Sequence, residues 1–373
     1  MPSTRSLELR RQVGQLLIMG VEGTVMSQRL RVMLEKFQPG GVILFKRNLE
    51  NAEQTHALLC EMQKATATPM FRCVDMEGGT VDRLRDVIAA MPSVADVASS
   101  DAKKLFRKHG RLIGEGVHAL GFNTDFAPVF DLRLQPSRNV LTTRTVSQNP
   151  KQTVVYAREF LRGLEECSVL GCGKHFPGLG EANLDSHNEL PVIAKPWKRL
   201  WKEDLLPYRE LRRDVPFVMV AHAAYPQVTG DRTPASLSKK WMNGILRKKI
   251  GYRGLIITDD LDMGGVLSAA PVEDAAVETL RAGADMFLVC QKEESVRRAF
   301  EAVLTRAERD KKFAALIRAK AERVLEVKRK SKSLKARIPK PPTAKTMERL
   351  TREIWEFGEE LRACALRTGE ASA

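Results

Sequence analysis

Apolar and polar positions along the chain predict short buried strands that alternate with helices. The strand candidates are apolar, β-branched runs of five to eight residues at 15–20, 41–45, 70–75, 122–129, 169–175, 217–222, 255–260 and 285–290. Between them lie stretches rich in Leu, Ala, Glu, Lys and Arg that favour helices, such as 51–65, 101–120 and 151–167. Near-continuous apolar strands alternating with helices are typical of a parallel sheet that is covered on both faces.

The number of these units predicts an α/β protein with a TIM-like (β/α)8 barrel, and a doubly wound open sheet is the alternative. We expect a single catalytic domain at 1–330, a basic, proline-containing linker at 331–345, and a C-terminal helix and tail at 346–373. This helical extension has an apolar face that predicts docking on the barrel or on another subunit. The face consists of Leu350, Ile354, Trp355, Phe357, Leu361 and Ala365.

Composition excludes several classes of protein. The chain has 373 residues, of which 43% are hydrophobic and 29% charged, as in ordinary globular proteins. No apolar run approaches the roughly 20 residues that cross a bilayer. The stretch 1–15 lacks the apolar region of a secretory signal. We therefore expect no membrane span and a cytoplasmic location.

The formal net charge of +15 raises the question of a nucleic-acid partner. Part of the excess lies at 327–345, which has eight Lys or Arg residues and no acid. A run of this kind usually forms a solvated tail or linker. No helix-turn-helix, zinc-finger or RNA-binding pattern accompanies it, so nucleic acid is not an expected partner. The oligomeric state stays open.

Ionisable side chains stand at the carboxyl ends of five predicted strands, where the active sites of (β/α)8 barrels lie. They are Asp75, Asp125, Lys174 with His175, His222, and Asp259 with Asp260. Each has an ordinary alternative, because a strand-end Asp often caps the next helix and His222 could be a satisfied interior histidine. Burying all of them at one end of a barrel without compensation would be costly, which favours a shared functional pocket.

The stretch 257–265 contains Asp259, Asp260 and Asp262 and could suggest a metal site. The spacing of a calcium loop is absent there, and no CxxC pair suggests zinc. We therefore expect no metal and no cofactor. A single Asp at the strand end, acting as nucleophile or electrostatic partner, fits better. Its acidic neighbours would then cap the next helix or point outward.

The segment KHFPGLGEANLDSH at 174–187 holds two of the six histidines. Lys174 and His175 leave the strand in opposite directions, so both can face a pocket only if the chain turns at once. The residues FPGLG that follow favour such a turn. Asp185 and His187 are two residues apart, a spacing at which a carboxylate can orient an imidazole for proton transfer. Many surface loops share this spacing, so it does not establish a catalytic pair by itself.

This segment resembles the KHFPGHGxxxxDSH signature of family 3 glycoside hydrolases of the single-domain bacterial β-N-acetylhexosaminidase type. Further blocks resemble that family in the same order, and together they span residues 10–330. They are GVILFKRN (41–48), VDMEGGTVDRL (74–84), FNTDFAPVFDL (122–132), MVAHAAYP (219–226), TPASLS (233–238), GLIITDDLDMGG (254–265) and AGADMFLVC (282–290). The resemblance implies a TIM-like barrel, in agreement with the strand count.

The resemblance also implies roles for individual residues. Asp259 would be the nucleophile, and His187, held by Asp185, would be the general acid/base. The residues that bind the N-acetylglucosamine ring would be Asp75, Arg83, Arg144, Lys174 and His175, and the strand-end His222 joins these candidates. The implied activity is that of a retaining exo-β-N-acetylglucosaminidase. It would act on N-acetylglucosamine-containing glycans of the cell wall (peptidoglycan) through a covalent glycosyl–Asp intermediate.

Four other functions stay open. A glycoside phosphorylase would use the same residues, because a neutral His187 acting as the base tolerates an entering phosphate better than a carboxylate in that role would. Another β-glycosidase of the same fold would also use these residues. An aldolase-type barrel would use Lys174 as a Schiff-base nucleophile but leaves Asp259 without a role. A catalytically drifted sugar-binding protein is favoured by three departures from the family pattern. The family has a His where this chain has Leu179, an Arg where it has Thr80, and GxRSFG where it has TTRTVS around Arg144. We expect Leu179 to alter the packing of its loop and not to abolish activity.

Overall fold

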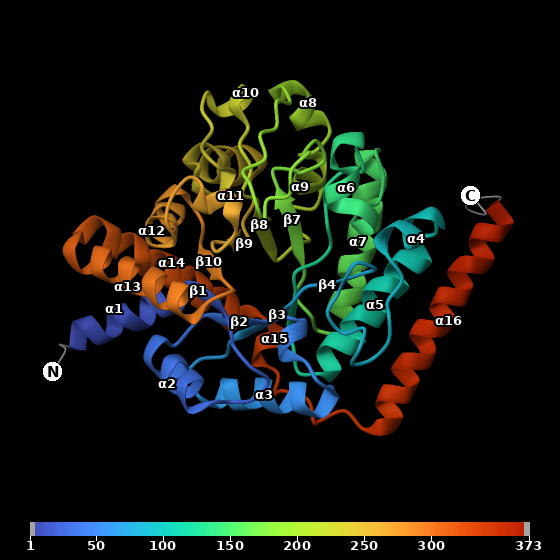
Figure 1. Cartoon of the computed structure of the whole chain (residues 1–373), viewed down its shortest axis with the longest axis horizontal. Helices are drawn as coiled ribbons and strands as arrows, with labels where there is room; N and C mark the ends of the chain where they lie inside the picture. Colours follow the sequence, from blue (N-terminus) through green and yellow to red (C-terminus); the bar gives the residue numbers. More distant parts are fainter. Residues whose placement is uncertain (1–3, 369–373) are drawn as a thin grey trace.

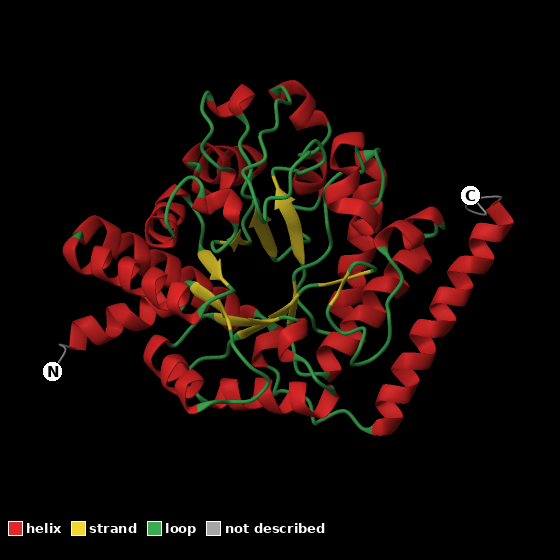
Figure 2. Ribbon diagram, viewed as in Figure 1, coloured by secondary structure: helices red, strands yellow, loops and turns green. Residues whose placement is uncertain are grey.

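Eight parallel strands form a nearly closed barrel at the centre of the protein. The computed structural model describes residues 4–368, and its strands lie inside a ring of helices (Figures 1 and 2). The strands are β1 (Leu17–Gly20), β2 (Gly41–Leu44), β3 (Phe71–Val74), β6 (Thr124–Asp125), β7 (Cys172–Phe176), β8 (Phe217–Val220), β9 (Leu255–Asp260) and β10 (Met286–Val289). They are hydrogen-bonded in the order β6-β3-β2-β1-β10-β9-β8-β7. Isolated bridges from Thr124 to Leu170 and from Val129 to Lys174 connect the two ends of this order.

The barrel strands form where the chain is apolar toward both the barrel interior and the helices. Every residue of these strands is buried except Asp259, which is partly exposed. Near the amino ends of β3 and β8, Phe71 packs edge-on against Phe217 with ring centroids 5.0 Å apart. These rings pack inside the amino-terminal half of the barrel, and the pocket lies at the carboxyl ends of the strands.

Helices cover the outside of the barrel. They are α1 (Thr4–Gly14), α2 (Gln28–Phe37), α3 (Ala52–Lys64), α4 (Val94–Ser99), α5 (Lys103–Ala119), α6 (Arg138–Leu141), α7 (Pro150–Glu166), α8 (Trp197–Lys202), α9 (Leu206–Glu210), α10 (Pro226–Thr229), the π-helix η5 (Lys240–Ile250), α11 (Gly264–Leu267), α12 (Val272–Ala282), α13 (Glu293–Arg309), α14 (Lys311–Lys330), α15 (Lys332–Lys335) and α16 (Ala344–Thr368). Short 3-10 turns are η1 (Lys46–Asn48), η2 (Gln135–Ser137), η3 (Thr142–Arg144) and η4 (Ala235–Leu237). Among the helices of residues 4–368, none is long and apolar enough to cross a membrane.

The predicted barrel is confirmed, and the strand at 122–129 differs from its prediction in length. Only Thr124–Asp125 forms β6, because Pro128 has no N–H to give to a strand ladder. The chain continues beside β7 through single hydrogen bonds, from the Cys172 N–H to the Ala127 carbonyl (2.7 Å) and from the Phe130 N–H to the Lys174 carbonyl (2.6 Å). These bonds close the barrel without a regular strand pair.

A hairpin that the sequence pattern did not predict follows β3. It consists of β4 (Met76–Gly78) and β5 (Val81–Asp82), which pair antiparallel. Gly78 and Gly79 have positive φ angles of 88° and 60° at the turn, a backbone conformation that glycine adopts without steric cost. The hairpin extends from the carboxyl end of the barrel and supplies further side chains to the pocket.

The basic segment at 327–345, which begins in the last turn of α14, is not a fully solvated linker. Lys328 is only 4% exposed, its ammonium donates to Gln15 Oε1 at 2.8 Å, and burial lowers its pKa to about 7. In α15, Leu334 is buried and the Ser333 hydroxyl donates to the Asn123 carbonyl at 3.3 Å. The segment 327–345 therefore packs in part against the amino-terminal end of the barrel.

The C-terminal helix α16 packs against α5 and α4 of the same chain (Figure 1). Its buried side chains are Leu350, Ile354, Phe357 and Leu361. Trp355 belongs to the predicted apolar face, yet its side chain is 62% exposed because it points away from this contact. The helix thus docks on the helices around the barrel, the first of the two possibilities that its pattern predicted.

Two substitutions on α16 test this docking. We expect Phe357→Ala to lower the free energy of unfolding by about 3 kcal/mol, because the buried ring packs against His109 and the ammonium of Lys108. Trp355→Ala on the same helix should change it by less than about 0.5 kcal/mol. Denaturant unfolding of the wild type and both variants measures the two effects. Equal effects would contradict the observed orientation of the helix.

Candidate active site

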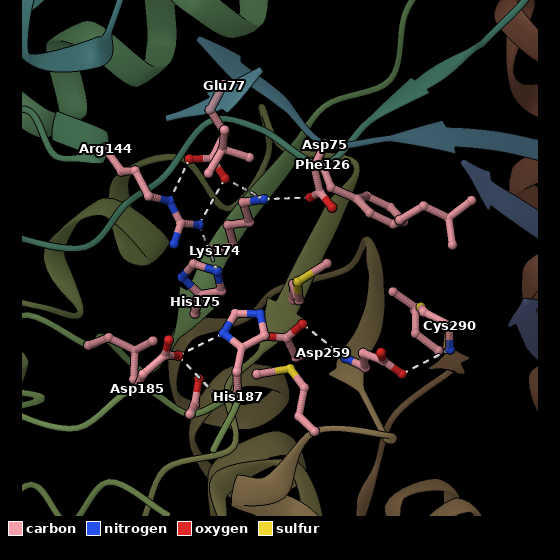
Figure 3. A pocket seen from close by; sticks show the side chains of 18 of the residues that line it. Asp75, Glu77, Phe126, Arg144, Lys174, His175, Asp185, His187, Asp259 and Cys290 are labelled. Carbon is pink, nitrogen blue, oxygen red and sulfur yellow. Dashed lines mark hydrogen bonds and ion pairs between the residues drawn. The ribbon is translucent and has the colours of Figure 1, made fainter. Parts of the chain in front are cut away.

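Side chains from the carboxyl ends of three strands meet in one pocket (Figure 3). Asp75 follows β3, Lys174 and His175 lie in β7, and Asp259 lies in β9. The β4–β5 hairpin and the loops add Glu77, Arg83, Arg144, Asp185 and His187 to the lining. The structure thus brings eight of the nine predicted site residues together, all except His222.

Asp259 faces this pocket from the end of β9. Its carboxylate accepts a hydrogen bond from the backbone N–H of Asp260 at 2.9 Å. Burial raises the pKa of this carboxyl, but the neighbouring imidazoles of His175 and His222 outweigh burial and hold the pKa below its usual value. Asp259 is therefore ionised at neutral pH, as an attacking carboxylate must be.

The two acidic neighbours of Asp259 have structural roles. The carboxylate of Asp260 accepts from the backbone N–H of Cys290 (2.9 Å) and from Gln291 Nε2 (3.1 Å), and burial raises its pKa to about 6. Asp262 accepts from the Gln291 backbone N–H at 3.1 Å. The prediction that these residues cap the next helix or point outward is wrong for Asp260, which is buried and connects the end of β9 to the chain after β10. Asp262 makes a similar connection from a half-exposed position. Within residues 4–368, no group of three or more His, Cys, Asp or Glu side chains is arranged to hold a metal ion.

A network of two cations and two carboxylates forms one wall of the pocket (Figure 3). Lys174 Nζ lies 2.7 Å from Asp75 Oδ1 and 2.7 Å from Glu77 Oε1. Arg144 donates to both oxygens of Glu77, from Nε at 2.8 Å and from Nη2 at 2.9 Å. Burial opposes every charge here, yet these contacts raise the pKa of Lys174 and Arg144 and lower the pKa of Glu77. A lysine with a raised pKa is a poor amine nucleophile, which disfavours the aldolase alternative.

Lys174 and His175 both reach the pocket because β7 is irregular. The register between β7 and β8 shifts between Gly173 and Phe176. The change of direction that the FPGLG sequence predicted therefore begins inside the strand. A register shift of this kind redirects a side chain and is frequent near active sites.

Glu77 and Asp131 contact predicted site residues, although the sequence pattern did not single them out. Asp131 Oδ2 lies 2.7 Å from His175 Nδ1, and its Oδ1 accepts the backbone N–H of Leu179 at 2.7 Å. Asp131 therefore orients the ring of His175 and holds the start of the loop after β7. Both acids lie within blocks that resemble the family, 74–84 and 122–132, so a signal for them was present.

Asp185 and His187 lie on the loop between β7 and α8, at the open side of the pocket. Asp185 Oδ1 is 2.7 Å from His187 Nδ1 and also accepts the His187 backbone N–H at 3.0 Å. Partial burial raises the pKa of Asp185, but these hydrogen bonds lower it overall. Because an ionised carboxylate can only accept, Nδ1 carries the proton and Nε2 is left for a ligand. The His187 side chain is 66% exposed, so a bound ligand can reach it.

Arg83 lines the pocket and has an unpartnered donor among the described residues. Its guanidinium lies 5.9 Å from the centre of the Phe45 ring. Its buried Nε has no hydrogen-bond partner among residues 4–368. Arg83 therefore differs from Arg144, whose guanidinium is already held by a carboxylate, and it can donate to a ligand directly.

Two predicted strand-end residues lie behind the pocket wall. His222 is fully buried, with Nδ1 2.7 Å from the Ser236 hydroxyl and Nε2 3.0 Å from the Asp260 carbonyl. Since both ring nitrogens have protein partners, His222 supports the end of β9 and is not placed to contact a sugar. Asp125 is also fully buried and accepts the Met76 N–H at 2.9 Å, and burial raises its pKa well above the usual value.

Barrel enzymes keep their reacting groups at the carboxyl ends of the strands, and this chain does so with a carboxylate, an imidazole and two fixed cations. Comparison with known proteins shows to which enzyme family the chain belongs. The family described as "Glycosyl hydrolase family 3 N terminal domain" matches residues 8–327. The chain belongs to glycosyl hydrolase family 3 and is a glycoside hydrolase.

Individual relatives agree with this assignment. A protein of Alkalilimnicola ehrlichii named beta-hexosaminidase is 36% identical over 287 residues, which is 75% of this chain and 82% of that protein. The structure of a family 3 β-N-acetylglucosaminidase from Paenibacillus sp. matches 94% of this chain and 68% of that chain, with a TM-score of 0.88 and 30% identity. NagZ from Neisseria gonorrhoeae matches over 83% and 97% of the two chains, with a TM-score of 0.71 and 28% identity. The resemblance seen in the sequence blocks is confirmed.

Replacing Glu77 tests the buried network. We expect Glu77→Gln to lower the free energy of unfolding at pH 7 by about 3 kcal/mol, because Lys174 and Arg144 lose a shared carboxylate in a buried place. The folded-state pKa of Glu77 lies below its usual value, so its contribution is present at neutral pH and is lost as the pH falls. The difference between wild type and variant should therefore shrink below about pH 4 in denaturant unfolding at a series of pH values.

The control for this experiment is Glu166→Gln, which removes an exposed ion pair with Arg107. It should cost less than about 1 kcal/mol at pH 7. A Glu77→Gln difference that stays constant from pH 7 to acid would contradict an ionised Glu77.

Proposed function

We propose that the protein is a retaining exo-β-N-acetylglucosaminidase that removes terminal non-reducing N-acetylglucosamine from glycans. One observation carries the proposal: an ionised Asp259 and the hydrogen-bonded pair Asp185–His187 line the same pocket. The names of the relatives, beta-hexosaminidase and β-N-acetylglucosaminidase, support the same class of sugar. Peptidoglycan fragments as the natural glycan and a cytoplasmic location remain predictions from the sequence.

In the first step of this mechanism, an oxygen of Asp259 attacks the anomeric carbon. The bond from that carbon to the leaving oxygen breaks while His187 Nε2 gives its proton to the leaving oxygen. Asp185 beside Nδ1 stabilises the imidazolium before the transfer. The products are a glycosyl ester on Asp259, a neutral imidazole and the free aglycone alcohol.

In the second step, His187 Nε2 takes a proton from water as the water oxygen attacks the anomeric carbon. The ester bond to Asp259 breaks and its electron pair returns to the carboxylate. Two displacements on the same carbon retain its configuration. An imidazole suits both roles, because it titrates near neutrality and adds no second negative charge beside Asp259.

The sugar ring would be held by the wall of the pocket that contains the network of Lys174 and Arg144. This wall lies opposite the Asp185–His187 pair. Asp75 can accept from a ring hydroxyl, while Lys174 and Arg83 can donate. His175 is held by Asp131 at Nδ1 and faces Arg144 Nη2 with Nε2 at 3.5 Å, so it orders this wall of the pocket. Arg144 uses Nε and Nη2 on Glu77, which leaves Nη1 for a ligand. Since the ion pairs fix Lys174 and Arg144 before the sugar binds, little side-chain entropy is lost on binding.

Removal of the nucleophile tests the proposal. We expect the wild type to hydrolyse a chromogenic β-N-acetylglucosaminide and Asp259→Ala to lose about 10⁴-fold or more in kcat, because no other ionised carboxylate replaces the attacking group. The control Asp86→Ala removes an exposed carboxylate that pairs with Lys46 and should keep full activity. A wild type without turnover, or a fully active Asp259→Ala, would contradict the proposal. Adding phosphate should not change the product from free sugar to sugar 1-phosphate, which separates the hydrolase from a phosphorylase.

Two leaving groups test the role of His187. We expect His187→Ala to lower kcat/KM by about 100-fold or more for an alkyl aglycone, which cannot leave without a proton. A dinitrophenyl aglycone leaves as a stable anion, so its kcat/KM should fall far less. An equal loss for both aglycones would contradict proton donation by His187.

A further inference from the structure

The tip of the loop that carries His187 is hydrogen-bonded to the turn that follows the Asp259 strand. The Gly264 N–H donates to the His187 carbonyl oxygen at 2.8 Å, and the Gly265 N–H donates to the Ser186 carbonyl oxygen at 3.0 Å. These glycines begin α11, and the first N–H groups of a helix have no acceptor within it. The loop supplies the missing acceptors.

Glycine at these positions lets the loop approach closely. A Cβ at position 264 would lie 2.2 Å from the Asn188 carbonyl oxygen and 3.0 Å from that of His187. A Cβ at position 265 would lie 2.8 Å from the Ser186 carbonyl oxygen. All three oxygens belong to the backbone of the loop, so the loop would have to move away from any side chain added at position 264. Because Gly264 lies in a helix, alanine can adopt its backbone conformation.

At the tip, Asp185 holds His187 by hydrogen bonds within the loop, and ion pairs stabilise the base of the loop. The carboxylate of Glu181 pairs with Arg199 at 3.1 Å and with the buried ammonium of Lys195 at 3.5 Å. Closer to the tip, the residues at 183–185 are exposed. The hydrogen bonds from Gly264 and Gly265 connect the backbone beside His187 to the segment that carries Asp259.

The geometry points to Gly264 and Gly265 as positioning residues for the proton donor. Their N–H groups bind the loop, and their lack of side chains lets the loop come close enough for these bonds. Together these features hold His187 in place relative to Asp259. Gly264 follows Asp259 by five residues in one continuous segment, so the nucleophile and the support for the proton donor belong to the same part of the barrel. This inference rests on the proposed role of His187 and adds to it the surface on which the loop docks.

A substitution at position 264 separates positioning from general structural damage. We expect Gly264→Ala to lower kcat/KM for an alkyl β-N-acetylglucosaminide by about 10-fold to 100-fold, because a displaced His187 donates its proton poorly. For the dinitrophenyl substrate, kcat/KM should change by less than about 3-fold. The control is Gly244→Ala on η5, where an added Cβ meets nothing closer than 3.9 Å and both substrates should react as with the wild type.

The double variant gives a second, independent readout. In a His187→Ala background, Gly264→Ala should cause no further loss with the alkyl substrate, because the group that it positions is already gone. Gly265→Ala should show the same dependence on the leaving group as Gly264→Ala. Thermal unfolding of all these variants should remain close to that of the wild type, since the docking contact lies outside the barrel core.

Each contrary result has a definite meaning. Equal losses on both substrates, no loss on either, additive losses in the double variant, or an unfolded Gly264→Ala would each overturn the positioning role. A His187→Ala variant whose loss does not depend on the leaving group would instead overturn the proposed function. The two failures are thereby distinguishable.

Discussion

Glu77 carries a negative charge in a place that water scarcely reaches, and the wall of the pocket depends on that charge. Its carboxylate lies between Lys174 and Arg144, which come from β7 and from the loop after β6, while Glu77 itself comes from the β4–β5 hairpin. An unpaired charge at this depth would be costly, so each ion requires the others. The three segments are thereby tied together at the point where the sugar ring would bind.

The surroundings of each carboxyl group decide whether it is charged. Cations lower the pKa of Glu77, and imidazoles lower the pKa of Asp259, in both cases against the effect of burial. For Asp260 and Asp125, burial outweighs the hydrogen bonds and charges that favour ionisation, and it raises the pKa of both carboxyls. Of these four acids at one end of the barrel, Glu77 and Asp259 are ionised and line the pocket. Asp260 and Asp125 instead bond to the backbone around it.

Two departures from the family pattern, Leu179 and Thr80, fall at positions whose side chains do not make the polar contacts of the site. Leu179 is buried, and its contact with Asp131 runs through the backbone N–H, which any residue except proline can provide. Thr80 is exposed at the turn of the β4–β5 hairpin. The ionised Asp259 and the hydrogen-bonded Asp185–His187 pair are retained, which favours an active enzyme over a drifted sugar-binding protein.

Hydrophobic periodicity was enough to predict the eight strands and the barrel, because burial on both faces leaves a local pattern in each strand. The place of Asp259 at a strand end and the spacing of Asp185 and His187 are local features as well. The partners of these residues are not local. Glu77 and Arg144 are 67 residues apart, and Asp131 and His175 are 44 apart, so each pair meets only when the barrel closes. His222 looked like a pocket residue for the same reason that Asp259 did, since both end a strand. Their different exposure depends on how neighbouring strands and loops pack, and packing between distant segments leaves no periodic signal in the order of the amino acids.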